Sequence, residues 1–433
     1  MGPIFLVLVV VAIVTGLFTG HMQEVTQASI ESAGSGVTLA IGLIGVMTFW
    51  LGLVEVLSRA GLLGSLARGL RPLFRRLFPD VPDGHPALAA MTMNIAANMM
   101  GLVNAATPFG IAAMRQLDRL NTRKGTSTDA MCLFLAINTS AVAILPTGVI
   151  AARAALGSRD ASGIIVTTLV ATSLSTLGAI LAALLLSRLP YFRRTRPPAP
   201  ASEAGENPPL DAELPRSDSK TPNWVPWRVR VSLGLAVLTV VGAVWGLYHL
   251  AVSDTDPGQL RLAVSSLALP LIILFAMLYG WSRQVEVYAA IVEGGKEGFQ
   301  VAVRIIPYIV AILVAVGMFR ASGALDLLIG FLDPVTSRVG MPGEALPMAL
   351  LRPLSGSGAY AVMAETMKVH GPDSFVGYLV STMQGSTETT FYVLAVYGGE
   401  IGLRRTRHAL PACLMGDFFG IAASLVVCLY WLG

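Results

Sequence analysis

Long apolar stretches, separated by short polar ones, run through almost the whole chain. Each is long enough to cross a bilayer as a helix, which takes about 20 mostly apolar residues. The stretches fall near residues 3–20, 37–57, 129–152, 163–187, 228–250, 262–281, 299–319, 375–398 and 409–431. This pattern predicts an all-α polytopic membrane protein. The first stretch has no basic n-region and no small-residue cleavage site, so we expect an uncleaved span there and not a signal peptide.

The composition supports the same class. Of the 433 residues, 54% are hydrophobic and only 13% are charged, whereas soluble domains carry about 25% charge. The net charge of +4 does not indicate nucleic-acid binding, because most arginines lie in short stretches beside apolar runs. Cys132, Cys413 and Cys428 lie in apolar runs without the spacing of metal ligands, so we predict no redox or zinc site.

Two further apolar stretches, 86–113 and 344–366, are interrupted by polar residues and by Gly or Pro. The first contains "MNIAANMMGLVNAATPFG", and each unpaired amide in hydrocarbon costs several kcal/mol. Arg-rich segments flank this stretch on both sides, which places both flanks in the cytoplasm. A segment with both flanks on one side must enter the membrane and return. We therefore predict two re-entrant helical hairpins, with tips at 99–101 and 355–358, the second entering from the opposite surface.

The two halves of the chain resemble each other. "EVTQASIESAGSGV" at 24–37 aligns with "EVYAAIVEGGKEGF" at 286–299, and the same spacing pairs Gly61 with Gly323. This indicates a gene duplication, in which the 228–250 stretch has no counterpart. One added span inverts the second copy. The predicted fold is therefore two inverted-topology repeats with about nine spanning helices and two re-entrant hairpins.

The predicted organisation has four parts. A first repeat at 1–189 is followed by a linker at 190–225, an added spanning helix at 226–260 and a second repeat at 261–433. The linker is rich in Pro, Ser, Ala and both charges. We expect it to be disordered, because such a composition cannot form a packed core.

Charge bias predicts the sidedness of the loops. The N-terminus, the linker and "GLRRTRH" at 402–408 are expected inside, and an acidic loop at 21–36 outside. The loop with Arg153 and the loop at 320–343 fit poorly, because both carry arginine yet are placed outside. Gly294–Gly298 is expected to be a loop before a span.

Several motifs resemble known families. "MNIAANMMGLVNAATPFGIAAMRQLDRLN" with "FLAINTSAVAILPT" resembles spore maturation protein A, and "RPLSGSGAYAVMAE" with "HGPDSFVGYLVSTMQGSTETTFYVLAVYGG" resembles spore maturation protein B. The chain looks like a fusion of the two. Both belong to the nucleoside recognition or Gate domain group, similar to gates of ferrous-iron transport protein B and of concentrative nucleoside transporters. The resemblance implies a membrane fold and a family role in dehydration of the spore core, and it offers no binding residues to carry over.

Polar side chains at membrane depth gather at four corresponding places, the two hairpins and the centres of two spans. Hydrogen bonds between helices, at about 0.6–2 kcal/mol each, explain a single Ser or Thr. Four clusters at matching repeat positions instead favour a substrate cavity. The candidate substrate-binding residues are Asn94, Asn98, Asn104, Thr107, Asn138, Thr139, Ser140, Arg352, Ser355, Ser357, Gln384, Ser386 and Thr387.

Ionisable residues at membrane depth are functional candidates, because a charge there costs about 2.5–3.5 kcal/mol even on lenient scales. Glu388 is the strongest ion-coupling candidate, as a proton carrier or a Na⁺ ligand, and the alternative is a structural pair with Arg352. Glu365 and Asp417 are the other ion-coupling candidates. Arg352 could hold a carboxylate or phosphate through two parallel hydrogen bonds.

The leading hypothesis is a secondary transporter, coupled to Na⁺ or H⁺, that moves a small polar, anionic solute across the cytoplasmic (inner) membrane. The alternatives are a membrane enzyme acting on a lipid or cell-wall precursor, and a channel gate or partner subunit that transports nothing itself. No catalytic or metal-ligand constellation is recognisable, so we expect neither an enzyme nor a bound metal. The expected partners are membrane lipid and the solute, not nucleic acid. Gly- and Ala-rich helices also allow a homo-oligomer.

Overall fold

The computed structural model describes residues 2–198, 225–252 and 257–432. These residues are helical with no named strand, which confirms the predicted all-α class. The helices are α1 Gly2–Thr19, α2 Met22–Arg59, α3 Leu62–Leu77, α4 Pro86–Met99, α5 Val103–Arg119, α6 Asp129–Thr139, α7 Thr147–Ala155, α8 Ile164–Arg188, α9 Pro190–Arg194, α10 Pro226–Val252, α11 Pro257–Ser282, α12 Val287–Ala321, α13 Ala324–Thr336, α14 Leu346–Leu351, α15 Gly356–His370, α16 Phe375–Ser386, α17 Thr390–Glu400 and α18 Ala409–Leu432, with 3-10 turns at Ser337–Val339 and Gly343–Ala345.

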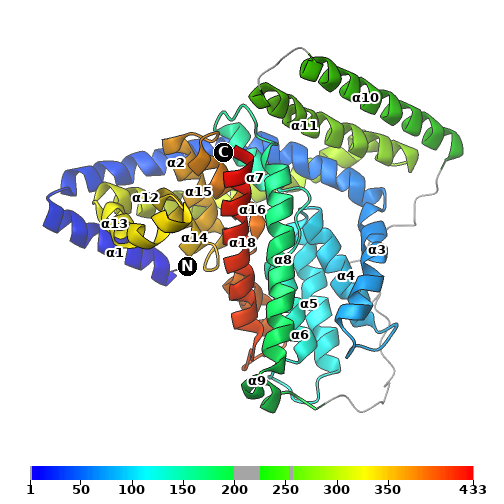
Figure 1. Ribbon diagram of the computed structural model, residues 1–433, viewed down its shortest axis with the longest axis horizontal. Helices are drawn as coiled ribbons and strands as arrows, with labels where there is room; N and C mark the ends of the chain where they lie inside the picture. Colours follow the sequence, from blue (N-terminus) through cyan, green and yellow to red (C-terminus); the bar gives the residue numbers. More distant parts are fainter. Residues whose placement is uncertain (1, 199–224, 253–256, 433) are drawn as a thin grey trace.

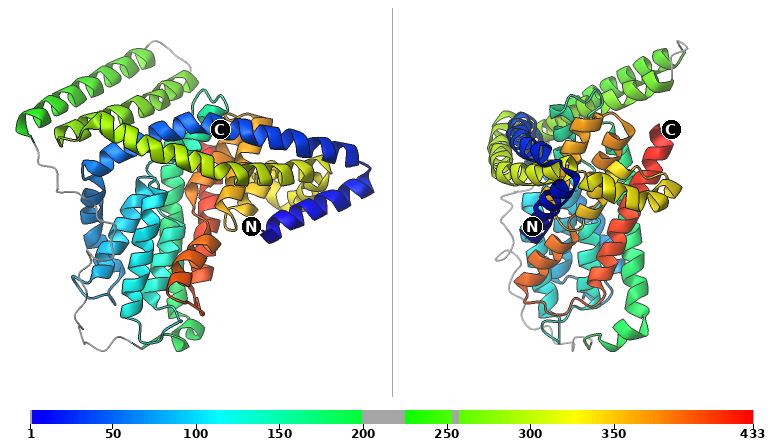
Figure 2. Two further views of the ribbon diagram at one scale, coloured as in Figure 1. Left: turned by 180° about the vertical axis from the view of Figure 1, so that it is seen from behind. Right: turned by 90° about the vertical axis from the view of Figure 1, so that its left-hand side faces the viewer.

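The helices form a bundle with two extensions (Figure 1). The bundle contains α3 to α6, α8 and α18, which run roughly side by side. The helices α1, α2, α12 and α13 extend from it on one side, while α10 and α11 extend on the other. Figure 2 shows from behind that α2 and α12 run past the end of the bundle. The core of the bundle is built mainly from small and branched apolar side chains, with many buried alanines.

Within the described residues, four helices are long and apolar enough to cross a membrane by themselves: α2, α8, α10 and α18. A fifth is reached if the bent helix α12 is counted as one span. Two of the predicted spans, 129–152 and 375–398, are broken in the middle, so neither half of each is long enough to cross a membrane by itself. The number of about nine spans therefore stays a prediction, while several apolar helices are confirmed.

The segment 86–113 is a helical hairpin, as predicted. Its arms α4 and α5 pack against each other, and they are joined at Gly101, which has a φ of 74°. A side chain at Gly101 would also lie 2.7 Å from the Leu145 carbonyl oxygen. Glycine therefore fits this tip for two reasons, its left-handed backbone and its close contact with the next broken helix.

The segment 344–366 forms the second hairpin, with a shorter first arm. Its arms α14 and α15 contact each other, and Arg352 to Ser355 lie between them. The Ser355 hydroxyl caps α15 by accepting a hydrogen bond from the Gly358 N–H at 2.9 Å. The side of the membrane from which each hairpin enters stays a prediction.

The inverted relation of the two repeats is confirmed by how equivalent helices pair. A Cβ at Gly36 of α2 would meet Val310 of α12, and one at Gly52 would meet Ile291. As the residue numbers rise along α2, the residue numbers of its contacts on α12 fall, so the two helices are antiparallel. The helices α8 and α18 pair in the same sense, since Gly416 faces Ala179 while Gly420 faces Ser175. Antiparallel packing of equivalent helices is typical of two repeats that are related by a pseudo-two-fold axis in the membrane plane.

Four of the predicted loops contain helix. The segment 21–36, predicted as an acidic loop, is the first half of α2, and Gly294–Gly298 lies inside α12. The glycines there allow close packing, because a Cβ at Gly298 would lie 2.6 Å from the Met47 carbonyl oxygen. The loop at 320–343 contains α13, and the Arg-rich segment predicted to lie in the cytoplasm before the first hairpin, 58–80, contains α3. The helix α3 is amphipathic, so its apolar side chains can pack on the protein while its arginines lie on the opposite, polar face.

Most of the predicted linker, residues 199–224, lies outside the described residues. Its first part, 190–198, contains α9 and is held to the first repeat. There Pro198 accepts a hydrogen bond from the Thr122 hydroxyl at 2.9 Å, and Arg196 is ion-paired with Asp80 at 2.8 Å. The boundaries of the four predicted parts stay predictions.

Candidate functional site

The two broken helices meet at their breaks. The break in the first repeat separates α6 from α7, and the break in the second separates α16 from α17. The Glu388 N–H donates to the Thr139 carbonyl at 2.6 Å, which joins one break to the other. Each break also bonds to the hairpin tip of its own repeat, from Ile144 to Met99 at 3.0 Å and from Phe391 to Pro353 at 3.2 Å. Four interrupted elements, two from each repeat, therefore converge on one site.

The breaks follow from the local sequence. The hydroxyls of Thr139 and Ser140 both donate back to the Ala136 carbonyl, at 3.0 and 2.8 Å, which competes with continued helix. In the second repeat, Thr387 and Thr389 adopt extended backbone between two helices. Consecutive polar residues cannot all face one side of a helix, so the unwound segments expose backbone groups to the site.

Three of the predicted asparagines form one buried network. Asn94 and Asn98, one turn apart on α4, both contact Asn138 at the end of α6, the Asn98 amide at 3.2 Å from the Asn138 oxygen. The Asn94 amide also donates to the Ala106 carbonyl at 2.7 Å and contacts the Tyr397 hydroxyl at 3.3 Å. Tyr397 belongs to α17 of the other repeat. The network therefore ties the first hairpin to both broken helices.

A buried arginine lies on the other side of the breaks. Arg352 is 3% exposed, and its guanidinium donates to the Thr389 hydroxyl at 3.2 Å. The Glu388 carboxylate is 4.0 Å away, at the limit of an ion pair, and the Glu388 side chain is 45% exposed. The Arg352 Nε is buried and has no partner among the described residues. This guanidinium thus makes few of the five hydrogen bonds that it can donate.

A buried carboxylate lies beside the same break. Asp417 of α18 is 2% exposed and accepts a hydrogen bond from the Thr390 hydroxyl at 2.7 Å. Its second oxygen has no hydrogen bond within the described part of the chain. The buried Thr387 hydroxyl lies close to this carboxylate but outside hydrogen-bond geometry. Arg352 and Glu388 are both within electrostatic range of Asp417. The site therefore holds two carboxylates, of Glu388 and Asp417, and one guanidinium, of Arg352.

The remaining candidates around the breaks have more local roles. Ser386 donates back to the Met383 carbonyl at 2.9 Å, and Ser355 is the helix cap described above. Gln384 has a buried side-chain oxygen with no partner among the described residues. Thr107 and Ser357 are half-buried on the second arms of the two hairpins. The backbone of Asn104 lies in α5, but its side chain is outside what the structure describes.

Glu365 lies away from the other candidates. It is ten residues beyond Ser355 on α15, about 15 Å along the helix axis. Its carboxylate pairs with Arg320 at 3.1 Å and lines a cavity of about 600 Å³ together with Lys368 and Glu31. The structure therefore does not bring Glu365 together with Glu388 and Asp417. The pair also accounts for Arg320, whose charge fitted the predicted loop sidedness poorly.

Two buried arginines hold loops of the two repeats together, and we call them the Arg153 clamp and the Arg407 clamp. The Arg153 side chain is fully buried and pairs with Asp373 at 2.9 Å, 4.7 Å above the Tyr378 ring. Arg407, at the equivalent place in the second repeat, pairs with Asp129 at 2.6 Å. A buried, paired arginine does not act as a charge on a cytoplasmic loop. This explains why Arg153 fitted the predicted sidedness poorly.

The clamps lie at opposite ends of α8. Arg153 donates to the Asp160 carbonyl, which precedes α8, and Arg407 donates to the Phe192 carbonyl, which follows it. The helix has 25 residues, or about 37 Å, so the clamps are roughly one membrane thickness apart. Next to the second clamp, burial lowers the pKa of His408 to about 4, although nearby Asp129 raises it.

Sequence reasoning missed Tyr397, Thr389, Thr390 and the two clamps. Tyr397 packs against Gly110 of the first hairpin, where a Cβ would meet the tyrosine ring at 2.3 Å. The residues are far apart in the chain, so only the fold relates them. Thr389 and Thr390 belong to the polar stretch that was recognised, but nothing in the sequence assigned them to Arg352 and Asp417.

Comparisons with known proteins agree with this architecture. The Gate family model, described as nucleoside recognition, matches residues 40–156 and 302–404. The first match runs from within α2 through α7, and the second from within α12 through α17. Each match therefore covers the long helix, the hairpin and the broken helix of one repeat.

Two curated proteins of Bacillus subtilis (strain 168) match different parts of the chain. Spore maturation protein B is 47% identical over 159 residues, which is 37% of this chain and 89% of that protein. Spore maturation protein A is 39% identical over 193 residues, which is 45% of this chain and 96% of that protein.

Among solved structures, the Alcanivorax borkumensis YdaH transporter aligns over 99% of this chain and 96% of its own, with 14% identity and a TM-score of 0.41. The Gate family model matches more than half of the chain. This multi-pass membrane protein belongs to the Gate (nucleoside recognition) family, and it joins in one chain segments similar to spore maturation proteins A and B.

Proposed function

We propose that this protein is an ion-coupled secondary transporter that moves a small polar, anionic solute across the cytoplasmic membrane. Inverted repeats whose interrupted helices meet between them are typical of such transporters. The observation that carries the proposal is the hydrogen bond between the two breaks, from Glu388 to Thr139, beside the buried Arg352. Backbone groups released from two helices and a buried cation are thereby available at one place.

Arg352 supports the anionic character of the solute. A buried charge is stable only when it is paired, yet among the described residues this guanidinium has one hydrogen bond and one contact at 4.0 Å. A carboxylate or phosphate would offer it two parallel hydrogen bonds. Because Glu388 is half-exposed and only loosely held, an incoming anion can take its place beside Arg352.

Glu388 and Asp417 support coupling to a cation. When the solute neutralises Arg352, both carboxylates lose part of their compensation, and a bound H⁺ or Na⁺ restores it. Asp417 has one oxygen with no partner among the described residues, which gives the ion a site inside the protein. We expect the N-terminus in the cytoplasm, and labelling of single cysteines from each side of the membrane would test that orientation.

The first experiment is uptake into proteoliposomes with an imposed Na⁺ or H⁺ gradient, screening dicarboxylates, phosphorylated precursors and nucleosides. We expect Glu388→Gln to abolish gradient-driven uptake and Arg352→Gln to reduce it by about 100-fold, since truncating one partner of a buried charge pair costs about 2–5 kcal/mol. The matched controls are Glu293→Gln and Arg230→Gln, at residues that are exposed and distant in the chain.

Two outcomes would contradict the proposal. Full coupled uptake by Glu388→Gln would remove this carboxylate from the mechanism. Chemical conversion of a candidate compound by the purified protein in detergent, where no gradient exists, would favour a membrane enzyme. Thermal unfolding of each variant in detergent separates loss of function from loss of fold.

A further inference from the structure

A second cavity, of about 580 Å³, lies at the end of α8 where the chain passes into α9. Its walls are apolar and come from three elements, with Leu77 at the end of α3, Leu133 on α6 and Leu184 on α8. Its polar lining consists of two carboxylates, three arginines, Ser187 and His408. The cavity is separate from the two breaks, and the proposed transport cycle does not use it.

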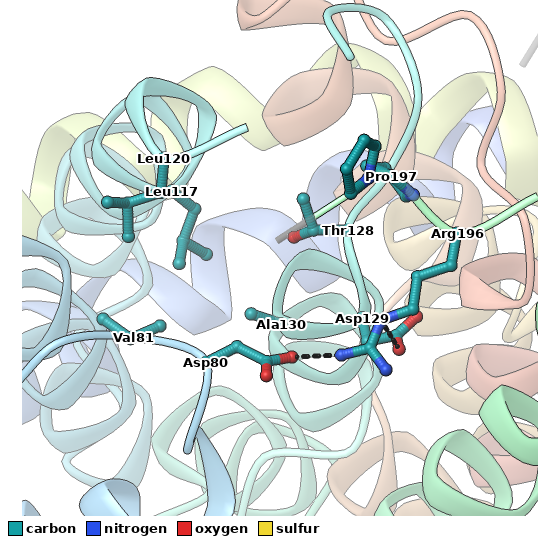
Figure 3. A pocket seen from close by; sticks show the side chains of 10 residues that line it. Asp80, Val81, Leu117, Leu120, Thr128, Asp129, Ala130, Arg196 and Pro197 are labelled. Atoms are coloured by element: carbon teal, nitrogen blue, oxygen red, sulfur yellow. Dashed lines mark hydrogen bonds and ion pairs between the residues drawn. The ribbon is translucent and has the colours of Figure 1, made fainter. Parts of the chain in front are cut away.

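The charges around this cavity do not balance. Arg196 is paired with Asp80 at 2.8 Å and with Asp129 at 3.1 Å, as Figure 3 shows for the adjoining pocket. Both acids in the lining are therefore compensated, and Asp129 is also held by Arg407.

Arg188 and Arg193 are different. They are exposed, and within the described part of the chain neither guanidinium has a hydrogen-bond or ion-pair partner. Among the described residues, two positive charges in the lining of this cavity are therefore left uncompensated.

The position of the cavity points to the membrane interface. Just before Arg188, the outer face of α8 exposes Leu181 and Leu185 by 50% and 62%, as a lipid-facing surface does. Directly after it, Tyr191 is 73% exposed, and tyrosines gather where hydrocarbon gives way to headgroups. The arginines therefore lie at the depth of lipid phosphates, while the leucines of the cavity wall lie toward the acyl chains.

We propose that this cavity binds an anionic phospholipid. The phosphate lies between Arg188 and Arg193, and the upper part of an acyl chain lies along Leu77, Leu133 and Leu184. Charge complementarity favours an anionic headgroup, since the two guanidinium groups can each donate to phosphate oxygens. A phospholipid also matches the mixed lining better than a free anion does, because a free anion would leave the apolar walls uncovered.

The test measures lipid binding to the full-length protein in a non-ionic detergent. Phosphatidylglycerol, cardiolipin, phosphatidylcholine or inorganic phosphate is added, and the retained lipid is counted by native mass spectrometry beside a thermal-unfolding measurement. The variant is Arg188→Gln with Arg193→Gln. The matched control is Arg71→Gln with Arg123→Gln, which removes the same charge from two exposed arginines outside the cavity lining.

We expect the wild-type chain and the control to retain one anionic lipid and to be stabilised by it, and the variant to bind it at least about tenfold more weakly, the effect of about 1.4 kcal/mol. Equal binding of phosphatidylcholine would overturn the proposal, and so would equal stabilisation by inorganic phosphate alone. Unchanged retention by the variant would overturn it as well. If the double variant fails to fold, Arg193→Gln alone provides the same comparison at an exposed position.

Discussion

At the scale of single residues, the buried polar groups differ in how far they satisfy one another. The amides of Asn94, Asn98 and Asn138 bond to each other, which is the pattern of a structural network. Arg352 and Asp417 each keep a buried atom without a partner among the described residues. A buried polar atom without a hydrogen bond costs free energy, so a bound ligand would be expected to supply the hydrogen bonds that these two residues lack.

Part of this site could be predicted from the sequence. The i, i+4 spacing of Asn94 and Asn98 placed them on one helix face, and both do contact Asn138. Glu388 and Arg352 stood out because charges are rare at membrane depth. Glu365 did not join them, because position within an apolar run cannot tell which neighbour a side chain meets. The fold pairs it with Arg320.

His408 gives a prediction about pH. Its pKa is lowered to about 4 by burial, against an ordinary value of 6.5. Between these values the unfolded chain binds a proton that the folded chain excludes, so the folded state loses stability as the pH falls from about 6.5 toward 4. We expect the unfolding temperature of wild type to fall across this range and that of His408→Gln to fall less. Because burial and Arg119 also lower the pKa of His85, some slope should remain in the variant. Identical pH profiles would contradict the assignment.

At the scale of the elements, the interrupted helices were the easiest to predict and the polar halves of long helices the hardest. The candidate residues Asn138, Thr139 and Ser140 lie at the centre of a predicted span, and α6 ends there, at Thr139. The stretch 21–36 was predicted as a loop because its polar residues did not suit a membrane span. It is helical because it packs along α12 of the other repeat, a contact that no local pattern reveals.

The contact between α2 and α12 can be tested at Gly298. An added methyl group would lie 2.6 Å from the Met47 carbonyl oxygen, so the two backbones would have to separate. We expect Gly298→Ala to destabilise the protein by about 1–3 kcal/mol, as overpacking does. The control is Gly45→Ala on α2, where a Cβ meets nothing within 4 Å and alanine favours helix. Thermal unfolding in detergent measures both variants. A Gly298→Ala protein as stable as the control would refute the close packing.

At the scale of the whole molecule, the duplication was visible in aligned motifs, and the inverted relation followed from one unmatched helix. What the sequence could not show is how the repeats fit together. The helices of each repeat do not form separate bundles, because α2 packs along α12 and α8 along α18. The duplication shows which helices of the two repeats correspond, but side-chain packing decides which of these helices are in contact.

This intertwined arrangement predicts that the chain can be cut without falling apart. A protease site placed within residues 205–215, followed by cleavage after purification, should leave both fragments together on a size-exclusion column in mild detergent. We expect this because the fragments remain in contact through α2 on α12 and α8 on α18. The control is the same cut in SDS, where the fragments should separate. Elution of either fragment alone from the mild detergent would show that each repeat is an independent unit.

The two clamps have a consequence for the order of events in the proposed transport cycle. Each joins a loop of one repeat to a loop of the other, and the internal symmetry relates them, so releasing either should cost a similar free energy. Both clamps have further contacts, since Arg196 also pairs with Asp129, and the Arg159 N–H donates to Asp373 at 2.8 Å. Only at the Arg407 end do the described loops also pair through their backbones, where the Ser127 N–H donates to the Arg405 carbonyl at 3.0 Å. Because of this backbone pairing, we expect the Arg407 clamp to release more slowly than the Arg153 clamp in the proposed cycle. Without any ligand, most molecules would then expose the site between the breaks on the side of the membrane where the Arg153 clamp lies.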